Sequence, residues 1–221
     1  MTAEPRGPLA LLHTSPVHVP VFDGLRDRHH PGLGLRHLVH EELLDRARAE
    51  GPDAVAGEVG AVLTRAVADG ARAVLCTCST IGAVAEAQAA ALGVPVLRVD
   101  RPMAAEAMRD GRLVVVVAAL ASTVEPTMEL LREESTGRTT FVRSLVLPEA
   151  WQRFEAGDRD GYLDAVAGAV DRIDPSRGTV VVLAQASMAD AVERVRTPLR
   201  VLSSPASGLA AAAAAAGYRP E

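Results

Sequence analysis

Two cysteines, Cys76 and Cys78, lie one residue apart in the segment LCTCSTIG, where an apolar run ends and a stretch with helical spacing begins. A cysteine near the start of a helix can act as a nucleophile or an acid–base group, because the helix dipole favours the thiolate. Cys78 is nearer to the expected helix, so it is the candidate catalytic residue, and Cys76 is expected to be buried. The alternative is that both are small core side chains, as free cysteines often are. We expect no disulfide between them.

Small polar residues follow the other apolar runs in the same way. In an open parallel sheet, ligands bind beyond the carboxyl ends of the strands, so these residues are candidates for a binding site. Hydroxyl and backbone N–H groups at those ends can hold a carboxylate without a cation, which suggests a small acid as substrate. Each Ser or Thr taken alone could equally be a helix cap. The expected substrate-binding residues are His13, Thr14, Ser15, Ser79, Thr80, Ser122, Thr123 and Gln185.

Short apolar runs alternate with stretches of helical spacing, which predicts an α/β fold with parallel sheets covered by helices. The predicted strands are Leu9–Leu12, Ala73–Leu75, Val94–Val99, Leu113–Val117, Phe141–Leu147, Val180–Leu183 and Leu199–Leu202. The predicted helices are Val55–Gly70, Gly82–Leu92, one that begins at Pro126 and runs through Met128–Glu134, Tyr162–Ile173 and Leu209–Ala216. The stretch Val21–Leu44 is a candidate lid, and a boundary between two lobes is placed within Asp100–Gly111.

Composition argues against several classes of function. The net charge of −5, with 3% aromatic residues, gives no basic surface for nucleic acid. All 23 basic residues are arginine, so a lysine Schiff base and a Walker-type phosphate loop are excluded. The histidines, all in the first 40 residues, form no His-Glu-x-x-His pattern, and no metal is expected. The N-terminus lacks a signal-like or membrane-spanning run, so we expect a cytoplasmic protein without a membrane partner.

Four segments together resemble the aspartate/glutamate racemase superfamily over nearly the whole chain. CSTIGAVAEAQAAALGVPVLRVDRPMAAEAM is similar to the first cysteine motif of that superfamily, and ALASTVEPTMELL to its mid-chain substrate loop. VVVLAQASMADAV and VLSSPASGL are similar to its late strand-loop and terminal segments.

The resemblance implies two pseudo-symmetric flavodoxin-like lobes, residues 1–99 with 204–221 and residues 100–203, with the active site in the cleft between them. It also implies chemistry without a cofactor, a possible homodimer and a role in amino acid metabolism. Cys78 matches the first catalytic cysteine, and Ser79 and Thr80 match carboxylate contacts. Thr14, Ser15, Ser122 and Thr123 match other substrate-loop positions.

The chain departs from the superfamily where a second cysteine is expected. The Gly-Cys-Thr motif is replaced by Ala184-Gln185-Ala186-Ser187, which implies a single-cysteine member. Racemisation through two thiols is therefore disfavoured, and Cys78 is expected to act from one side of the substrate, as an isomerase or lyase. One alternative is a racemase or epimerase that uses Ser187 as its second catalytic group. Another is a protein that binds a small acid without turnover.

Overall fold

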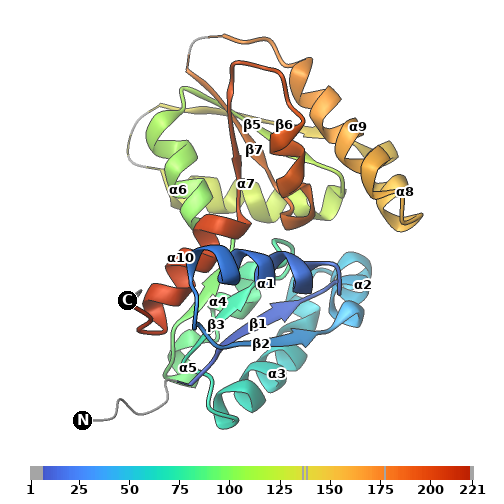
Figure 1. The fold of residues 1–221 in the computed structure, drawn as a ribbon. Helices are drawn as coiled ribbons and strands as arrows, with labels where there is room; N and C mark the ends of the chain where they lie inside the picture. Colours follow the sequence, from blue (N-terminus) through green and yellow to red (C-terminus); the bar gives the residue numbers. More distant parts are fainter. Residues whose placement is uncertain (1–6, 136, 138, 177, 220–221) are drawn as a thin grey trace. The chain divides into compact units, whose positions relative to one another are not determined.

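The computed structural model describes residues 7–135, 137, 139–176 and 178–219, and it forms two α/β units, each built on a four-stranded parallel sheet (Figure 1). The first unit comprises the described residues of Met1–Val99 and Pro205–Glu221, and the second comprises those of Asp100–Ser204. The predicted α/β fold class with parallel sheets is confirmed.

The sheet of the first unit has the strand order β2-β1-β3-β4, with all neighbours parallel. Its strands are β1 (Leu9–His13), β2 (Leu35–Val39), β3 (Ala73–Cys76) and β4 (Val96–Arg98). In the register of the central pair, Leu12 lies opposite Cys76. The segments that follow β1 and β3 therefore leave the sheet side by side at its carboxyl edge.

Helices cover both faces of this sheet because the strands are apolar on both faces. Leu9 and Leu11 pack on one face with Phe22 of α1 (His18–His29) and Leu209 of α10 (Pro205–Ala215). Residues of the other face pack with the remaining helical segments, which are α2 (Glu41–Glu50), η1 (Pro52–Val55), α3 (Ala56–Ala68), α4 (Gly82–Glu86) and α5 (Ala89–Leu92). Figure 1 shows α1 and α10 on the opposite side of the sheet from α3.

Helix α10 approaches the sheet closely through Gly208. A Cβ atom at this position would lie 2.4 Å from the carbonyl oxygen of Val99 and 2.6 Å from its Cγ2. Only glycine therefore allows this separation between α10 and the residue that follows β4.

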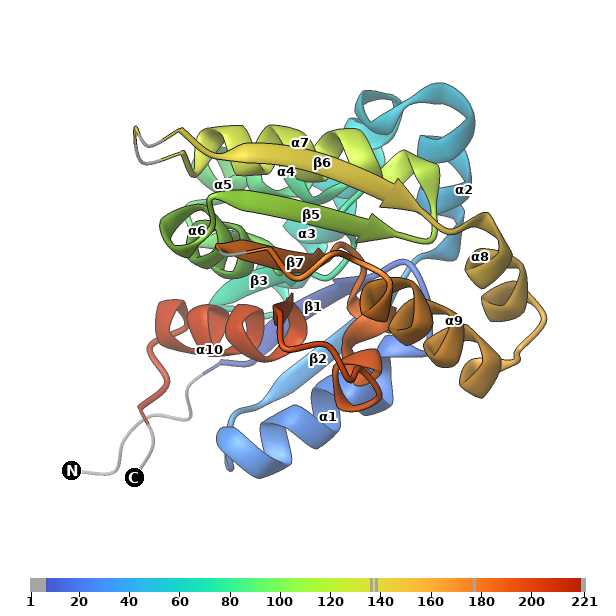
Figure 2. The same ribbon diagram turned by 90° about the horizontal axis from the view of Figure 1, so that it is seen from above.

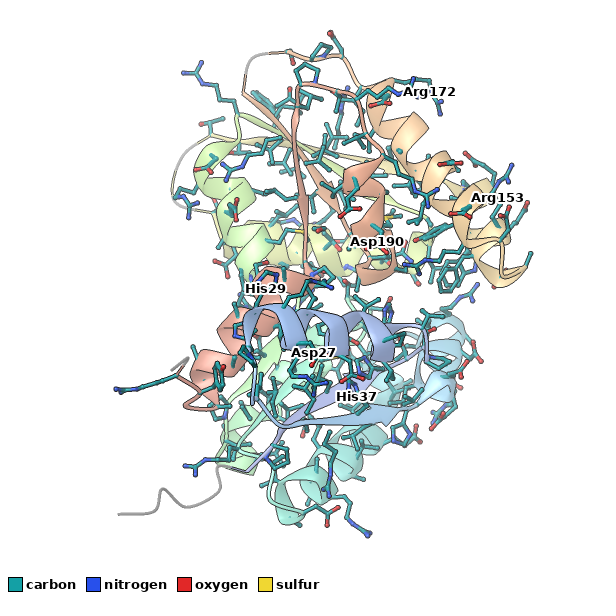
Figure 3. All side chains as sticks on the ribbon, in the orientation of Figure 1. Asp27, His29, His37, Arg153, Arg172 and Asp190 are labelled. Atoms are coloured by element: carbon teal, nitrogen blue, oxygen red, sulfur yellow. The ribbon has the colours of Figure 1, made fainter. Side chains whose placement is uncertain are left out.

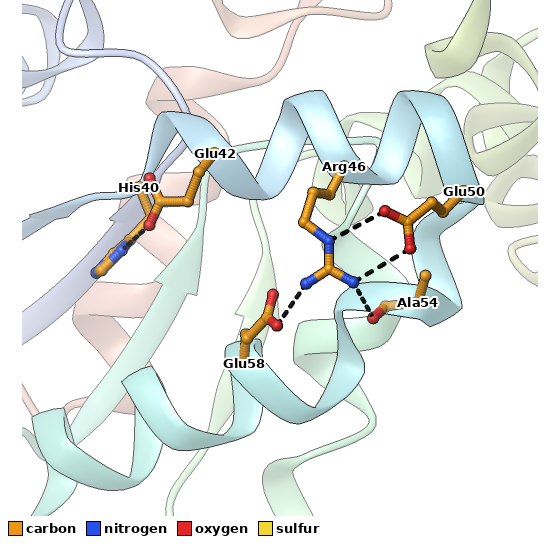
Figure 4. Close-up of polar contacts among 6 residues, drawn as sticks. All are labelled: His40, Glu42, Arg46, Glu50, Ala54 and Glu58. Atoms are coloured by element: carbon orange, nitrogen blue, oxygen red, sulfur yellow. Dashed lines mark hydrogen bonds and ion pairs between the residues drawn. The ribbon is translucent and has the colours of Figure 1, made fainter.

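Polar contacts tie α2 to the segment that follows it. Arg46 of α2 donates to Glu50 through two contacts of 3.2 Å, to the carbonyl oxygen of Ala54 at 3.4 Å, and to Glu58 of α3 (Figure 4). These side chains are exposed, so water and salt screen the ion pairs. Their role is to fix local geometry more than to stabilise the unit.

The second unit repeats the topology of the first, with the parallel strand order β6-β5-β7-β8. Figure 2 shows β6, β5 and β7 side by side. The strands are β5 (Leu113–Ala118), β6 (Phe141–Val146), β7 (Thr179–Leu183) and β8 (Arg200–Ser203).

Two groups of helices cover the second sheet. Residues of α6 (Arg101–Asp110) and α7 (Val124–Glu133) pack on one face, and η2 (Ala121–Thr123) leads into α7. Residues of α8 (Pro148–Glu155), α9 (Arg159–Asp171) and η3 (Ala186–Glu193) pack on the other. Arg153 and Asp190, labelled in Figure 3, belong to exposed ion pairs of this second group, with Asp158 and Arg159 respectively.

The structure corrects one prediction about the elements, since the single helix predicted over Gly82–Leu92 is two short helices, α4 and α5. The candidate lid, residues 21–44, contains most of α1, the edge strand β2 and the start of α2, and its role as a lid stays a prediction. The predicted boundary segment, residues 100–111, contains α6, and the second unit begins at Asp100. None of the helices in the described residues is long and apolar enough to cross a membrane.

Candidate active site

The carboxyl edge of the first sheet gathers the predicted residues of that unit. His13 ends β1 and is followed by Thr14 and Ser15, while Cys78, Ser79 and Thr80 follow β3. The backbone N–H of Thr77, the residue directly after β3, donates to the carbonyl oxygen of Leu12 in β1 at 2.9 Å. Because β1 and β3 are hydrogen-bonded neighbours, the topology places these six residues on one edge of one sheet.

Both cysteines are free and buried, and Cys78 is 8% exposed. They belong to the same apolar cluster, with Ile81 and Val84. The Sγ of Cys76 donates to the carbonyl oxygen of Cys78 at 3.6 Å. The description of the chain as a single-cysteine member is wrong in this detail, because it has two free thiols. Helix α4 begins at Gly82 and has only 5 residues, so its dipole at Cys78 is weak.

A chain of polar contacts runs from helix α1 to the residue between the two cysteines. We define the histidine chain as Asp23, His37, His13 and Thr77; His37 is labelled in Figure 3. Asp23 Oδ1 lies 3.4 Å from His37 Nε2, and His37 Nδ1 lies 2.8 Å from His13 Nε2. His13 Nδ1 lies 2.8 Å from Thr77 Oγ1, which is also 3.1 Å from the carbonyl oxygen of Leu12.

Burial strongly disfavours a charge on His13 and on His18. Burial and the neighbouring His18 and His37 lower the pKa of His13 to about 3. Burial lowers the pKa of His18 to about 4, and its buried Nδ1 has no hydrogen-bond partner among the described residues. Both ring nitrogens of His13 already have partners, so a direct contact with a ligand requires one of these bonds to break.

No group of three or more His, Cys, Asp or Glu side chains in the part of the chain that the structure describes is arranged to hold a metal ion. His40, next to the strand that carries His37, contacts Glu42 instead, with 2.7 Å between Nδ1 and Oε1 (Figure 4).

The carboxyl edge of the second sheet gathers its predicted residues in the same way. Gln185 follows β7, and its Oε1 accepts hydrogen bonds from the backbone N–H groups of Ala119 at 2.7 Å and Leu120 at 3.0 Å. This side chain fixes the loop that leads from β5 to Ser122 and Thr123. Thr123 is buried, and the hydroxyl oxygen of Ser122 is buried without a hydrogen-bond partner among the described residues.

Ser187 lies at the start of η3, and its hydroxyl is 2.8 Å from that of Tyr162 in α9. Burial raises the pKa of Tyr162 to about 12, although the bond to Ser187 opposes this shift. The sequence predicts a helix that begins at Tyr162, but it does not predict the contact between Tyr162 and Ser187. The two residues are 25 positions apart, and no spacing rule connects them.

His37 is the other residue that sequence reasoning missed. It lies in β2, whose mixture of basic and apolar residues does not resemble the continuous apolar runs of β3 and β5. The structure brings the predicted residues of each unit to the edge of its own sheet. Their roles in catalysis and binding stay predictions.

Comparison with known proteins supports the same fold. The chain is similar to a glutamate racemase from Bacillus anthracis, with 16% identity over 96% of this chain and 82% of that chain, and a TM-score of 0.67. It is similar to a glutamate racemase from Thermus thermophilus in complex with β-chloro-D-alanine, with 21% identity over 99% and 85% of the two chains and a TM-score of 0.67. It is also similar to an arylmalonate decarboxylase, with 22% identity over 97% and 94% and a TM-score of 0.59. At these identities the likeness shows the fold alone.

No curated protein is similar enough in sequence to match the chain. Residues 16–215 match the model of a protein family described as Asp/Glu/Hydantoin racemase. The matched range includes both sheet edges described above, except for the three residues that end β1 and follow it. The chain belongs to the Asp/Glu/hydantoin racemase family.

Proposed function

We propose that this protein is a cofactor-independent enzyme that acts next to the carboxylate of a small acid, with Cys78 as its acid–base or nucleophilic group. The observation that carries the proposal is the position of Cys78 directly after β3, beside the polar segment that follows β1. Cys78 is largely shielded from bulk water. Electrostatic interactions with a bound anion are stronger in such a shielded site than in water.

The carboxylate needs hydrogen-bond donors. In the first unit Thr14, Ser15, Ser79 and Thr80 supply hydroxyl and backbone N–H groups at one sheet edge. Such donors stabilise the negative charge that develops on a carboxylate as it becomes an enediolate.

Two reactions need only one thiol. In a decarboxylation, the bond to the leaving carboxylate breaks, its electron pair forms an enediolate, and the Cys78 S–H protonates the α-carbon; the thiolate then recovers a proton from water. In an isomerisation, the Cys78 thiolate adds to a carbon–carbon double bond next to the carboxylate, the resulting single bond rotates, and elimination restores the double bond and the thiolate. Both reactions balance without an external oxidant or reductant.

The relatives support this range of chemistry. One similar structure is a glutamate racemase bound to a small amino acid analogue, and another is a decarboxylase of an acid. We propose small carboxylic or amino acids as ligands of this protein. We also propose that the protein is a homodimer. This part of the proposal rests only on the resemblance to the superfamily.

The racemase alternative requires a second acid–base group in the second unit. Ser187 is the candidate, but its partner Tyr162 has a pKa raised to about 12 and is protonated at neutral pH. A protonated phenol cannot take the serine proton, so this contact does not activate Ser187 as a base. The geometry therefore supports one-sided chemistry at Cys78 over racemisation with Ser187.

The proposal is tested with a panel of small amino acids, dicarboxylic acids, aryl-substituted malonic acids and unsaturated acids. Turnover is followed by NMR, and thermal stabilisation is measured for each compound. We expect turnover that is abolished in Cys78→Ala and changed little in Cys76→Ala. Full activity in a folded Cys78→Ala variant would overturn the assignment. Stabilisation by an acid that is never consumed would favour the binding-protein alternative.

A further inference from the structure

Each hydrogen bond of the histidine chain can be given a direction, because the groups at its two ends can only accept. One end is the carboxylate of Asp23, and at the other end Thr77 contacts the carbonyl oxygen of Leu12. Arg26, one turn along α1, contacts Asp23 Oδ1 at 3.1 Å, so a cation lies beside this carboxylate. Two directions of hydrogen bonding along the chain are compatible with these acceptors, and the two arrangements differ by one proton.

In the first direction the hydroxyl of Thr77 donates to Leu12. Its oxygen then accepts from His13 Nδ1–H, so that His13 Nε2 is bare and accepts from His37 Nδ1–H. The contact between His37 Nε2 and Asp23 is attractive only if this nitrogen is also protonated. This direction therefore requires a doubly protonated, positively charged His37.

In the second direction every group except Asp23 is neutral. His37 Nε2–H donates to Asp23, and His37 Nδ1 accepts from His13 Nε2–H. His13 Nδ1 then accepts from the Thr77 hydroxyl, which no longer donates to Leu12. The Leu12 carbonyl keeps the backbone N–H of Thr77 at 2.9 Å.

We propose that the histidine chain positions the cysteine-bearing segment Cys76–Cys78, and that it reverses its hydrogen-bond direction when His37 takes up a proton. This inference deepens the proposed function and rests on it, since it makes His37 and His13 positioning residues for Cys78. Thr77 is the link, because it lies between the two cysteines and bonds to β1 through both its backbone and its side chain.

The charged and titratable groups around His37 are few in the described residues. His13 faces it from β1, with stacked rings whose centroids are 5.1 Å apart, and Asp23 faces it from α1. Arg26 reaches it only through Asp23, and His18 packs against His13 with centroids 6.0 Å apart. The two directions differ in the number of bound protons only at His37, whose ring nitrogens both carry a proton in the first direction, so the proton that separates them lies on His37.

The direct test is NMR of the full chain labelled with 15N, because bare and protonated ring nitrogens have distinct shifts. As the pH rises, we expect the His13 proton to move from Nδ1 to Nε2 at the pH where His37 loses its charge. A folded protein in which His13 keeps one tautomer throughout would overturn the inference. A merely structural contact between the two rings would not exchange tautomers.

The second test measures Cys78 without requiring a substrate. In a Cys76→Ala background, iodoacetamide alkylates the remaining thiolate, forming the S–C bond and releasing iodide. We expect the rate to show an additional inflection with pH, at the pH of the His13 tautomer exchange. His37→Asn keeps a donor for His13 but cannot titrate, so this inflection is lost. The matched control His40→Asn keeps it.

The two hypotheses fail in distinguishable ways. If Cys78→Ala abolishes turnover but His37→Asn retains the alkylation inflection, the proposed function stands and the positioning role fails. If the tautomer exchange and the inflection are both present but Cys78→Ala is fully active, the proposed function fails instead. With a substrate in hand, His37→Asn should lower kcat about tenfold or more and leave KM nearly unchanged, as expected for a misplaced catalytic group.

Discussion

The hydroxyl of Tyr162 lies 2.8 Å from the hydroxyl of Ser187, at the position where the sequence departs from the two-cysteine pattern of its superfamily. Burial of this phenol raises its pKa to about 12. The pair is therefore a hydrogen bond between two neutral groups, and its contribution is to hold η3 against α9.

Ser187→Ala should leave kcat/KM within a few-fold of the wild-type value, because a neutral phenol does not make Ser187 a base. Tyr162→Phe should lower the free energy of unfolding by about 1 kcal/mol, the usual net value of one hydrogen bond. Urea denaturation measures the second effect and steady-state kinetics the first. A loss of activity of about two orders of magnitude in a folded Ser187→Ala variant would instead support the racemase alternative.

The buried histidines predict loss of stability in mild acid. The pKa values of His13 and His18 are lowered to about 3 and about 4, from an ordinary value of 6.5. The unfolded chain therefore binds more protons than the folded one between these values and pH 6.5, so stability rises with pH through this window. Each histidine contributes a slope of about 1.4 kcal/mol per pH unit there, and none above it.

His18→Leu tests this prediction, since the buried Nδ1 of His18 has no hydrogen-bond partner among the described residues. The variant should lose less stability than the wild type as the pH falls from 6.5 to about 4. His29→Gln, at an exposed position of the same helix, is the control and should follow the wild type. Parallel pH profiles for all three proteins would contradict the buried, neutral state of His18.

Gly208 should be irreplaceable in the packing of α10. In Gly208→Ala the new Cβ would lie 2.4 Å from the carbonyl oxygen of Val99, and overpacking of this kind costs about 1–3 kcal/mol. Gly57→Ala is a matched control in α3, because a Cβ there meets nothing within 4 Å. It should stabilise the protein by about 0.5–1 kcal/mol. Equal effects of the two substitutions on urea denaturation would be inconsistent with the close approach of α10.

Gln185 should matter for stability whatever its role toward a ligand. Gln185→Leu leaves the backbone N–H groups of Ala119 and Leu120 without their acceptor, at about 1–3 kcal/mol for each donor that stays buried. Gln185→Glu retains an acceptor at the same position and should cost less. If the two variants unfold at the same urea concentration, Gln185 does not hold this loop.

The strands of continuous apolar residues were predictable, because parallel strands buried on both faces leave a plain signal. β2 was not, since its basic residues and half-exposed side chains resemble a loop. The same strand carries His37, so the edge strand and the histidine chain were missed together. Polar residues at strand ends indicated His13, Cys78 and Gln185 from the sequence alone.

What the sequence could not give was the partner of each polar atom. His13 and His37 are 24 residues apart, and Gln185 and Ala119 are 66 apart. Such contacts depend on the order of strands in a sheet, which no local pattern encodes. The position of Cys78 in an apolar cluster likewise depends on contacts with residues far away in the sequence, such as Leu12 and Leu43.

The most direct test of one-sided chemistry at Cys78 is turnover in D₂O of the acid identified by the panel. For a decarboxylation the account predicts a product that carries deuterium at the protonated carbon in a single configuration, and for an isomerisation it predicts a product without deuterium at carbon. Cys78→Ala should form neither product. Deuterium in both enantiomers at equal rates, or undiminished labelling by a folded Cys78→Ala variant, would contradict it.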